Sequence, residues 1–160
     1  MYDTVRDLLD AFQSTPDSLA ALLSGHSEAE TRTARGGDEN WSVVEVVCHL
    51  RDAEERAIER MRKMRDEHNP FLAAYDQERW VVERNYASES IRDALSKFLN
   101  LRTPHVDELR ALSPAAWEHT GQHEEQGQIT IASQTLHLVC HDAIHLAQIA
   151  RQLARLSQMD

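Results

Sequence analysis

The chain has 160 residues, of which 41% are hydrophobic, and it carries 17 basic against 27 acidic residues, a formal net charge of −10. This length and composition predict one folded domain spanning residues 1–160, with a sizeable core. The acidic surplus argues against nucleic acid as the main partner, because no excess of basic residues is available to neutralise phosphates. No apolar run approaches the length of a membrane span, so no membrane partner is expected.

The start of the chain and its cysteines favour the cytoplasm. The first residues, MYDTVRDLLD, are acidic and amphipathic, unlike a signal peptide. Cys48 and Cys140 are too few for a secreted disulfide scaffold. We interpret both as buried small apolar residues. Each precedes a histidine, but successive side chains on a helix point about 100° apart, so neither cysteine should share a ligand site with its neighbour.

The first half of the chain predicts two long helices. Residues 2–23 are helical, and Thr15-Pro16 inside them indicates either one kinked helix or two short ones. Polar residues 25–40, which include Gly36-Gly37, predict a loop. A capping box, Ser42-Val43-Val44-Glu45, then begins a helix that should run to about Glu67.

After Asn69-Pro70 stops that helix, residues 71–87 are ambiguous and contain one candidate short helix, Asp76 to Arg84. Ser88 is the predicted cap of a third long helix that ends near Leu112. A turn of helix follows Ser113-Pro114, and residues 121–127 predict a polar loop.

The last long helix is expected to begin after Thr130 and to continue to about Leu156. No stretch alternates in the manner of a strand with hairpin turns. Four long helices therefore predict an all-α fold, a four-helix bundle with a long first connection and short additional helices.

The chain contains nine histidines, and three of them, His137, His141 and His145, are spaced four apart in the last helix. Imidazoles at positions i and i+4 lie one turn apart on the same side of a helix and can chelate one ion. His137 and His145 are about 12 Å apart along the axis, too far to bind one metal at about 2 Å. The helix therefore supplies two ligands at most.

A helical wheel selects the pair His141 and His145. With His141 at 0°, His145 falls near 40°, beside an apolar face between about 60° and 160°. That face is formed by Leu138, Val139, Leu146, Ile149 and Leu153. His137 falls near 320°, on the side of Arg151, Arg155 and Gln148, and is expected to face solvent.

His49 borders the apolar stripe of the second long helix in the same sense. Two helices packed through these stripes would bring His49 to His141 and His145. Three imidazoles suit zinc, nickel, copper or iron and leave coordination positions open, which is typical of a catalytic site. The alternative is that these histidines hydrogen-bond within or beside the core, since the His-x-x-x-His pattern is short.

Several charged residues lie near the same faces. Asp142 and Glu54 fall within apolar stripes, and buried carboxylates are costly unless paired. They are interpreted either as partners that orient the ligand imidazoles or as partly exposed carboxylates at helix edges. Arg56 and Arg60 lie near the His49 face and would bind a carboxylate substrate or, alternatively, are ordinary solvated arginines.

His141-Asp142-Ala143-Ile144-His145 differs by one residue from the zincin motif His-Glu-x-x-His. Asp replaces the glutamate that serves as general base, and its side chain is one methylene shorter. The predicted bundle also lacks a strand edge for a peptide substrate. A metalloprotease is therefore disfavoured, and no nucleophile elbow or cysteine at a helix N-terminus supports nucleophilic catalysis by the protein.

Two long stretches of the chain resemble DinB-like proteins, the damage-inducible superfamily of metal-binding four-helix bundles. The first is WSVVEVVCHLRDAEERAIERMRKMRDEHNPFLAAYDQERWVVERNY and the second is HEEQGQITIASQTLHLVCHDAIHLAQIARQL. The shared motifs are a histidine in the helix after Trp-Ser and a final His-Asp-x-x-His. These proteins are not the translesion polymerases that share the gene name.

The resemblance implies a metal site formed by His49, His141 and His145, a zinc or nickel ion, and a homodimer. It also implies a reaction in which a low-molecular-weight thiol, such as bacillithiol or mycothiol, is transferred to an electrophile. The metal would hold the thiol as thiolate. The substrate pocket is predicted to include Arg56, Arg60, Asp76 and His123.

A hydrolase using the same metal is a related possibility. Two alternatives have no reaction: a metal-binding stress-response bundle, and a purely structural bundle without metal.

Overall fold

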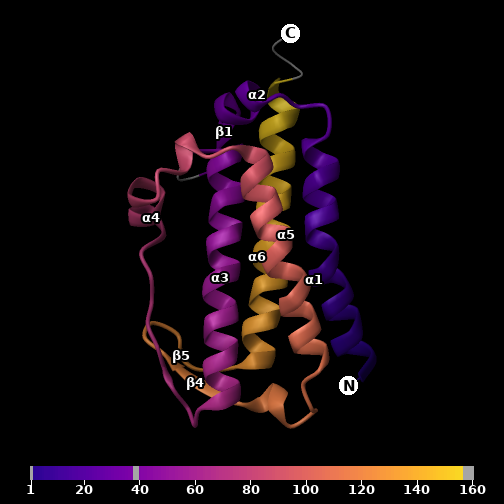
Figure 1. Ribbon diagram of the computed structural model, residues 1–160, viewed down its shortest axis with the longest axis vertical. Coiled ribbons are helices and arrows are strands. Elements are labelled where there is room, and N and C mark those ends of the chain that lie inside the picture. The colour runs from indigo at the N-terminus through magenta and orange to yellow at the C-terminus, as the bar shows by residue number, and fades with distance from the viewer. Residues whose placement is uncertain (1, 38–39, 157–160) are drawn as a thin grey trace.

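The computed structural model describes residues 2–37 and 40–156 of the chain. Four long helices form its body (Figure 1), which confirms the predicted all-α four-helix bundle. They are α1 (Tyr2–Leu23), α3 (Val43–Asp66), α5 (Ile91–Arg110) and α6 (Ile131–Leu156). No helix among the described residues is long and apolar enough to cross a membrane.

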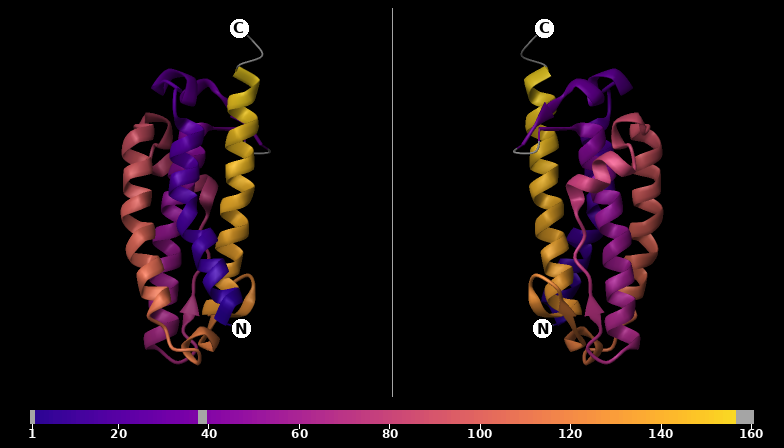
Figure 2. Two further views of the ribbon diagram at one scale, coloured as in Figure 1. Left: turned by 90° about the vertical axis from the view of Figure 1, so that its right-hand side faces the viewer. Right: turned by 90° about the vertical axis from the view of Figure 1, so that its left-hand side faces the viewer.

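The order of the helices around the bundle differs from their order in the chain. α3 packs against α5 and α6, and α1 packs against the same two helices. α1 and α3 therefore occupy diagonal corners. In Figures 1 and 2, α1 and α6 run in one direction along the bundle, and α3 and α5 run in the other. The antiparallel pair of α3 and α6 is the one that matters for the site described below.

The helix starts follow from local capping. Ser42 caps α3, and Glu45 reaches back to the backbone of Ser42, so the predicted capping box is confirmed. Thr130 precedes α6 and accepts a hydrogen bond from the N–H of Ser133 at 3.0 Å. α1 continues through Pro16 as a single helix. These caps fix where the two histidine-bearing helices begin.

The first connection is not the simple loop expected for residues 25–40. It contains the short helix α2 (Glu28–Thr33), which begins with a second capping box between Ser27 and Glu30. Two-residue strands β1 (Arg35–Gly36) and β2 (Trp41–Ser42) then pair in antiparallel fashion. The prediction was wrong because the glycines and charged residues of this stretch are typical of a loop. The six-residue helix has only one local sequence signal, its capping box.

The connection between α3 and α5, residues 67–90, returns along the length of the bundle (Figures 1 and 2). It contains β3 (Phe71–Leu72), the predicted short helix as α4 (Gln77–Glu83) with Asp76 as its cap, and a 3-10 turn, η1 (Tyr86–Ser88). The cap of α5 is Ser90 and not the expected Ser88, because Ser88 belongs to the preceding 3-10 turn.

The connection between α5 and α6 forms a hairpin where a polar loop was predicted. After the 3-10 turn η2 (Ala116–Glu118), strand β4 (Thr120–His123) pairs antiparallel with β5 (Gly127–Thr130) and parallel with β3. Four-residue strands are too short to show alternation, and the partner of β4 comes from a distant segment. The sequence pattern therefore missed this sheet.

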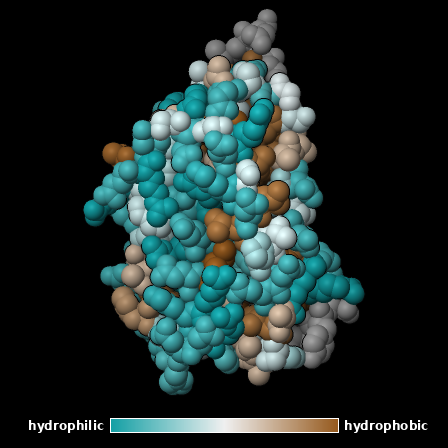
Figure 3. Space-filling model, viewed as in Figure 1, coloured by the Kyte–Doolittle hydropathy of each residue, from teal (hydrophilic) through white to brown (hydrophobic). Residues whose placement is uncertain are grey.

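The core is apolar along the inner faces of the helices, whereas the face seen in Figure 3 is largely hydrophilic with scattered hydrophobic residues. Cys48 is buried in this core, as expected. Cys140 is exposed, which corrects the expectation that both cysteines are buried. It follows His137, another exposed residue of α6, by three positions, so both lie toward the outer side of the helix.

Candidate metal centre

Three histidines meet where α3 packs against α6. His49 Nε2 lies 2.9 Å from His141 Nε2, and the candidate ligand atoms of His49, His141 and His145 all lie within 4.8 Å of one another. The three rings also contact each other pairwise, with centroids 4.5 to 4.9 Å apart. The structure thus brings together the three residues that the helical wheels selected.

Burial and mutual proximity keep the imidazoles of His49 and His141 neutral. Burial, followed by the nearby His141 and His145, lowers the pKa of His49 well below its ordinary value. Burial, followed by His145, lowers the pKa of His141 to about 3. Both rings are therefore uncharged at neutral pH, and neutral imidazole is the form that binds a metal.

The spacing of the three histidines fits a transition metal. Nitrogen ligands about 2.0–2.1 Å from a tetrahedral ion lie about 3.3 Å from each other. The observed atoms therefore need only small side-chain shifts to reach one ion. His141 Nδ1 is buried without a hydrogen-bond partner among the described residues. No protein group of the described chain at this atom therefore competes with a ligand for the His141 ring.

Gln148 holds His145 in place. Its Oε1 accepts a hydrogen bond from His145 Nδ1 at 2.8 Å, and its Nε2 donates to the carbonyl of Gly36 at 3.2 Å. Such a partner fixes the tautomer and presents Nε2 as the ligand atom. The wheel placed Gln148 on the solvent side, which was wrong. The spacing of three residues between His145 and Gln148 was the available signal.

His137 is exposed and stays outside the cluster, as predicted. Its ring centroid is 6.1 Å from that of His141, in a stacked arrangement. It is therefore a neighbour of the cluster and a suitable control for experiments on it.

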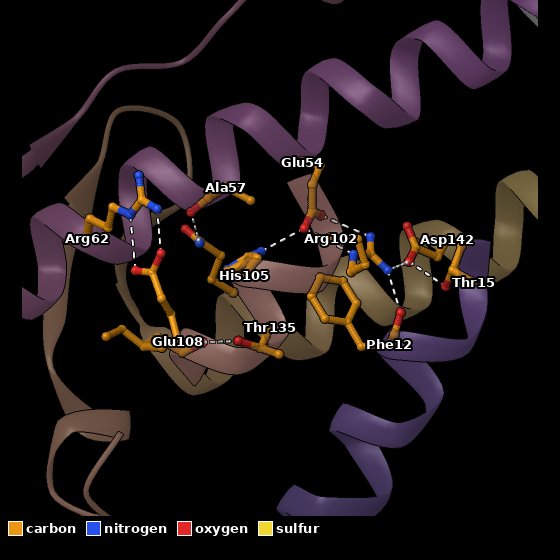
Figure 4. Close-up of polar contacts among 12 residues, drawn as sticks. Phe12, Thr15, Glu54, Ala57, Arg62, Arg102, His105, Glu108, Thr135 and Asp142 are labelled. Atoms are coloured by element: carbon orange, nitrogen blue, oxygen red, sulfur yellow. Dashed lines mark hydrogen bonds and ion pairs between the residues drawn. The ribbon is translucent and has the colours of Figure 1, made fainter. Parts of the chain in front are cut away.

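A buried ion cluster lies beside the histidines, centred on Arg102 of α5 (Figure 4). The guanidinium donates to both oxygens of Glu54, at 3.0 and 2.9 Å, and to Asp142 at 2.7 Å. Its carbon also lies 3.5 Å from the ring centroid of Phe12 and 4.7 Å from that of Phe98. A buried arginine is stable only when it is paired in this way.

The same cluster corrects the roles expected of Glu54 and Asp142. Glu54 also contacts His105 Nδ1 at 2.7 Å, and Asp142 accepts from the hydroxyl of Thr15 at 2.8 Å. Both carboxylates thus pair with Arg102 inside the core. The interpretation that they orient the ligand imidazoles was wrong. Sequence reasoning missed Arg102, although its place between Phe98 and Val106 at helical spacing indicated a buried charge.

The pKa values of Glu54 and Asp142 are shifted in opposite directions. Burial alone would raise the pKa of Glu54, but the hydrogen bond from His105 and the charge of Arg102 outweigh it and lower the pKa. For Asp142, burial outweighs Arg102 and Thr15, and the pKa is raised. Asp142 is held on the core side, so it does not take the place of the zincin base.

A cavity of about 820 Å³ opens beside His141, between α3, α6, the 74–78 segment and the β4–β5 turn. Three of the predicted pocket residues line it: Arg60, Asp76 and His123. Arg56, the fourth, lies elsewhere, over the ring of Trp80 and in an ion pair with Glu59. Tyr75 also lines the cavity and was not anticipated.

Comparison with known proteins assigns the family. The sequence profile of the DinB superfamily matches residues 11–149. The chain belongs to the DinB superfamily. It is 32% identical over 124 residues to "Putative metal-dependent hydrolase OB0782" of Oceanobacillus iheyensis, which covers 78% of this chain and 70% of that protein. A protein of Bacillus mycoides with the same type of name is 26% identical over 151 residues, covering 93% and 85%.

The fold also occurs in a solved structure of another four-helix bundle. YfiT from Bacillus subtilis, described as a probable metal-dependent hydrolase with an unusual four-helix bundle topology, superposes with a TM-score of 0.91. The match covers 98% of this chain and 90% of YfiT at 20% sequence identity. At that identity the likeness establishes the shared fold.

Proposed function

We propose that this chain is a metal-dependent enzyme in which His49, His141 and His145 hold one divalent transition metal, zinc or nickel. The observation that carries the proposal is the convergence of three imidazoles, those of His49 and His141 held neutral by burial, beside the cavity that His141 lines. A structural zinc site is usually closed by four protein ligands, whereas three leave room for water or substrate. The names of the relatives, which describe metal-dependent hydrolases, support the same class.

A metal held by three imidazoles supplies a nucleophile at neutral pH, because it lowers the pKa of a water or thiol that binds to it. The chain's own residues would position the reactants. Gln148 orients His145, and the packed helices keep His49 and His141 in register. The cavity beside His141 would hold the electrophile.

Two nucleophiles are compatible with this site. The relatives' names favour water and hydrolysis. The hydrogen bonds from Arg102 and Thr15 to Asp142 favour a thiol. The Asp142 carboxylate, which follows His141 in the chain, is held by these bonds and is not available as a general base. A thiol bound as thiolate needs no such base. The proposed partners are accordingly a low-molecular-weight thiol and an electrophilic small molecule.

The metal site is tested by elemental analysis of the purified chain and its variants. We expect close to one equivalent of metal in the wild type, and loss of it in His49→Ala. His137→Ala, which removes an exposed neighbour in the same helix, should keep its metal. Absence of stoichiometric metal in the wild type, or retention of it in His49→Ala, would contradict the site.

The reaction is tested separately on the metal-loaded protein. Consumption of bacillithiol or glutathione with an electrophile would support the transferase, and cleavage of ester or amide substrates without thiol would support the hydrolase. Either activity should disappear in His49→Ala. Metal binding without turnover in both assays would favour the alternative of a non-catalytic metal-binding bundle.

A further inference from the structure

The cavity beside His141 contains a histidine whose tautomer is fixed by the backbone. His123 is the last residue of β4 and is 4% exposed. Its Nδ1 accepts hydrogen bonds from the N–H groups of Glu125 and Gln126, at 3.2 and 3.3 Å, within the hairpin turn. A nitrogen that accepts two N–H groups carries no proton, so the proton of the neutral ring is on Nε2.

His123 is therefore a neutral donor. Protonation would place a hydrogen on Nδ1, against two N–H groups that already point at it. Burial, followed by the charge of Arg60, lowers the pKa of His123, in agreement with this geometry. The ring lines the same cavity as His141.

Arg60 lines that cavity too and differs from its neighbours on α3. Arg56, Arg62 and Arg65 each form an ion pair with a carboxylate. Among the described residues, no carboxylate lies within ion-pair distance of Arg60. Its Nη2 donates to the carbonyl of Ala73 at 2.6 Å, and its Nε, like that of Arg56, is buried without a hydrogen-bond partner in the described chain.

A half-buried guanidinium without a carboxylate is costly, and unpaired buried donors are rare. Burial lowers the pKa of Arg60, the direction expected of a cation that has lost water without gaining a full counter-charge. We propose that Arg60 and the Nε2–H of His123 form a two-donor site that binds a substrate carboxylate in the cavity beside His141. This inference rests on the proposed function, because it specifies the class of substrate held next to the metal.

The charge of the cavity favours a singly charged group. Four carboxylates, those of Asp76, Glu78, Glu124 and Glu125, lie around it. Asp76 accepts from the N–H of Arg79, and Glu124 from the N–H of Ala74, so two of the four are engaged with the backbone. Because these carboxylates keep the lining negative despite Arg60, a singly charged carboxylate meets less repulsion than a dianionic phosphate.

Binding of benzoate to the zinc-loaded full chain, measured by calorimetry, tests the proposal, with neutral benzamide as the matched probe. We expect benzoate to bind and benzamide to bind at least tenfold more weakly. Arg60→Gln should weaken benzoate about tenfold or more, because a charge-assisted hydrogen bond is lost. Arg56→Gln, a change one turn away outside the cavity, should alter binding by less than twofold.

The histidine is tested by two variants and by its own spectrum. His123→Phe removes both ring nitrogens, while His123→Asn retains an oxygen that can accept the turn N–H groups, so a folding defect is separated from loss of the donor. Both should weaken benzoate at least fivefold. Nitrogen-15 spectra of labelled histidine should show the Nε2–H tautomer and a shift of Nε2 on adding benzoate.

Equal binding of the two probes, unchanged affinity in Arg60→Gln, or an Nδ1–H tautomer would overturn the proposal. Unchanged affinity in Arg60→Gln would place benzoate elsewhere, for example on the metal. His49→Ala separates this failure from that of the proposed function. If that variant lacks metal and still binds benzoate in an Arg60-dependent manner, the two-donor site holds independently of the metal chemistry.

Discussion

At the scale of single residues, the site depends on side chains that hold the histidines as much as on the histidines themselves. His145 is oriented by Gln148, which is in turn anchored to the carbonyl of Gly36 in the first connection. Arg102, fully buried, ties Glu54 of α3 to Asp142 of α6 next to His141. A ligand set assembled from two helices is thus supported by contacts from two further segments, the first connection and α5.

Replacement of Gln148 tests this dependence. Gln148→Leu removes the acceptor of His145 Nδ1–H, so metal affinity should fall about 10- to 100-fold. Competition with a chromophoric chelator measures the affinity. Gln152→Leu is the matched control, because Gln152 lies one turn further on α6 and also donates to Gly36. Equal metal affinities in the two variants would show that Gln148 does not orient the ligand.

At the scale of elements, periodicity predicted the helices and their inward faces, because those are local properties. His49, His141 and His145 were selected in this way, and the caps at Ser42 and Thr130 were also read from neighbouring residues. The features that the sequence did not predict, such as the β3–β4 pairing, depend on residues far apart in the chain. β4 pairs with β3 as well as with β5, and the sequence separation between β3 and β4 conceals the first of these pairings.

The role of His123 escaped for the same reason. The residue was expected in a pocket within a loop, but its tautomer is set by a hairpin turn that the sequence did not predict. Arg60 was weighed as a solvated arginine because its lack of a counter-charge is visible only once the side chains are placed. Periodicity thus located the metal ligands, while the chemistry of the cavity required the three-dimensional contacts.

Gly121 provides a test of how the hairpin is positioned. A Cβ at this position would lie 2.5 Å from Leu72 Cδ1 and 2.9 Å from Met64 Cγ, so the strand packs against α3 and β3 with no room for a methyl group. Gly121→Ala should lower the free energy of unfolding by about 1–3 kcal/mol. Chemical denaturation measures this change. Gln122→Ala, at an exposed position of the same strand, should stay within about 0.5 kcal/mol of the wild type.

At the scale of the whole molecule, a metal bound at the proposed centre would cross-link α3 and α6, which belong to opposite halves of the chain. A ligand that binds only the folded state stabilises it in proportion to the logarithm of its concentration over Kd. Without metal, His49 and His141 of this cluster destabilise the fold in acid, because the fold keeps both rings neutral. The two effects have one structural origin, the burial of imidazoles at the contact of two helices.

The metal-free protein should therefore lose stability as the pH falls below about 6.5, the ordinary value for histidine. Between that pH and the lowered pKa of His141, about 3, the unfolded chain binds protons that the folded chain excludes. Each such histidine contributes a loss of about 1.4 kcal/mol per pH unit, and His49, whose pKa is also lowered, adds to the slope. Denaturant titrations in the presence of a chelator, at several pH values between 7 and 5, measure it.

His141→Asn removes one of these groups without introducing a charge, so its stability should depend on pH with a slope smaller by about 1.4 kcal/mol per pH unit. The comparison is between slopes, so any fixed cost of the substitution cancels. A wild-type stability that is flat from pH 6.5 to 5 would mean that the folded state accepts these protons. The cluster would then have to open in the absence of metal, because two protonated imidazoles at the observed separation of 2.9 Å would repel each other.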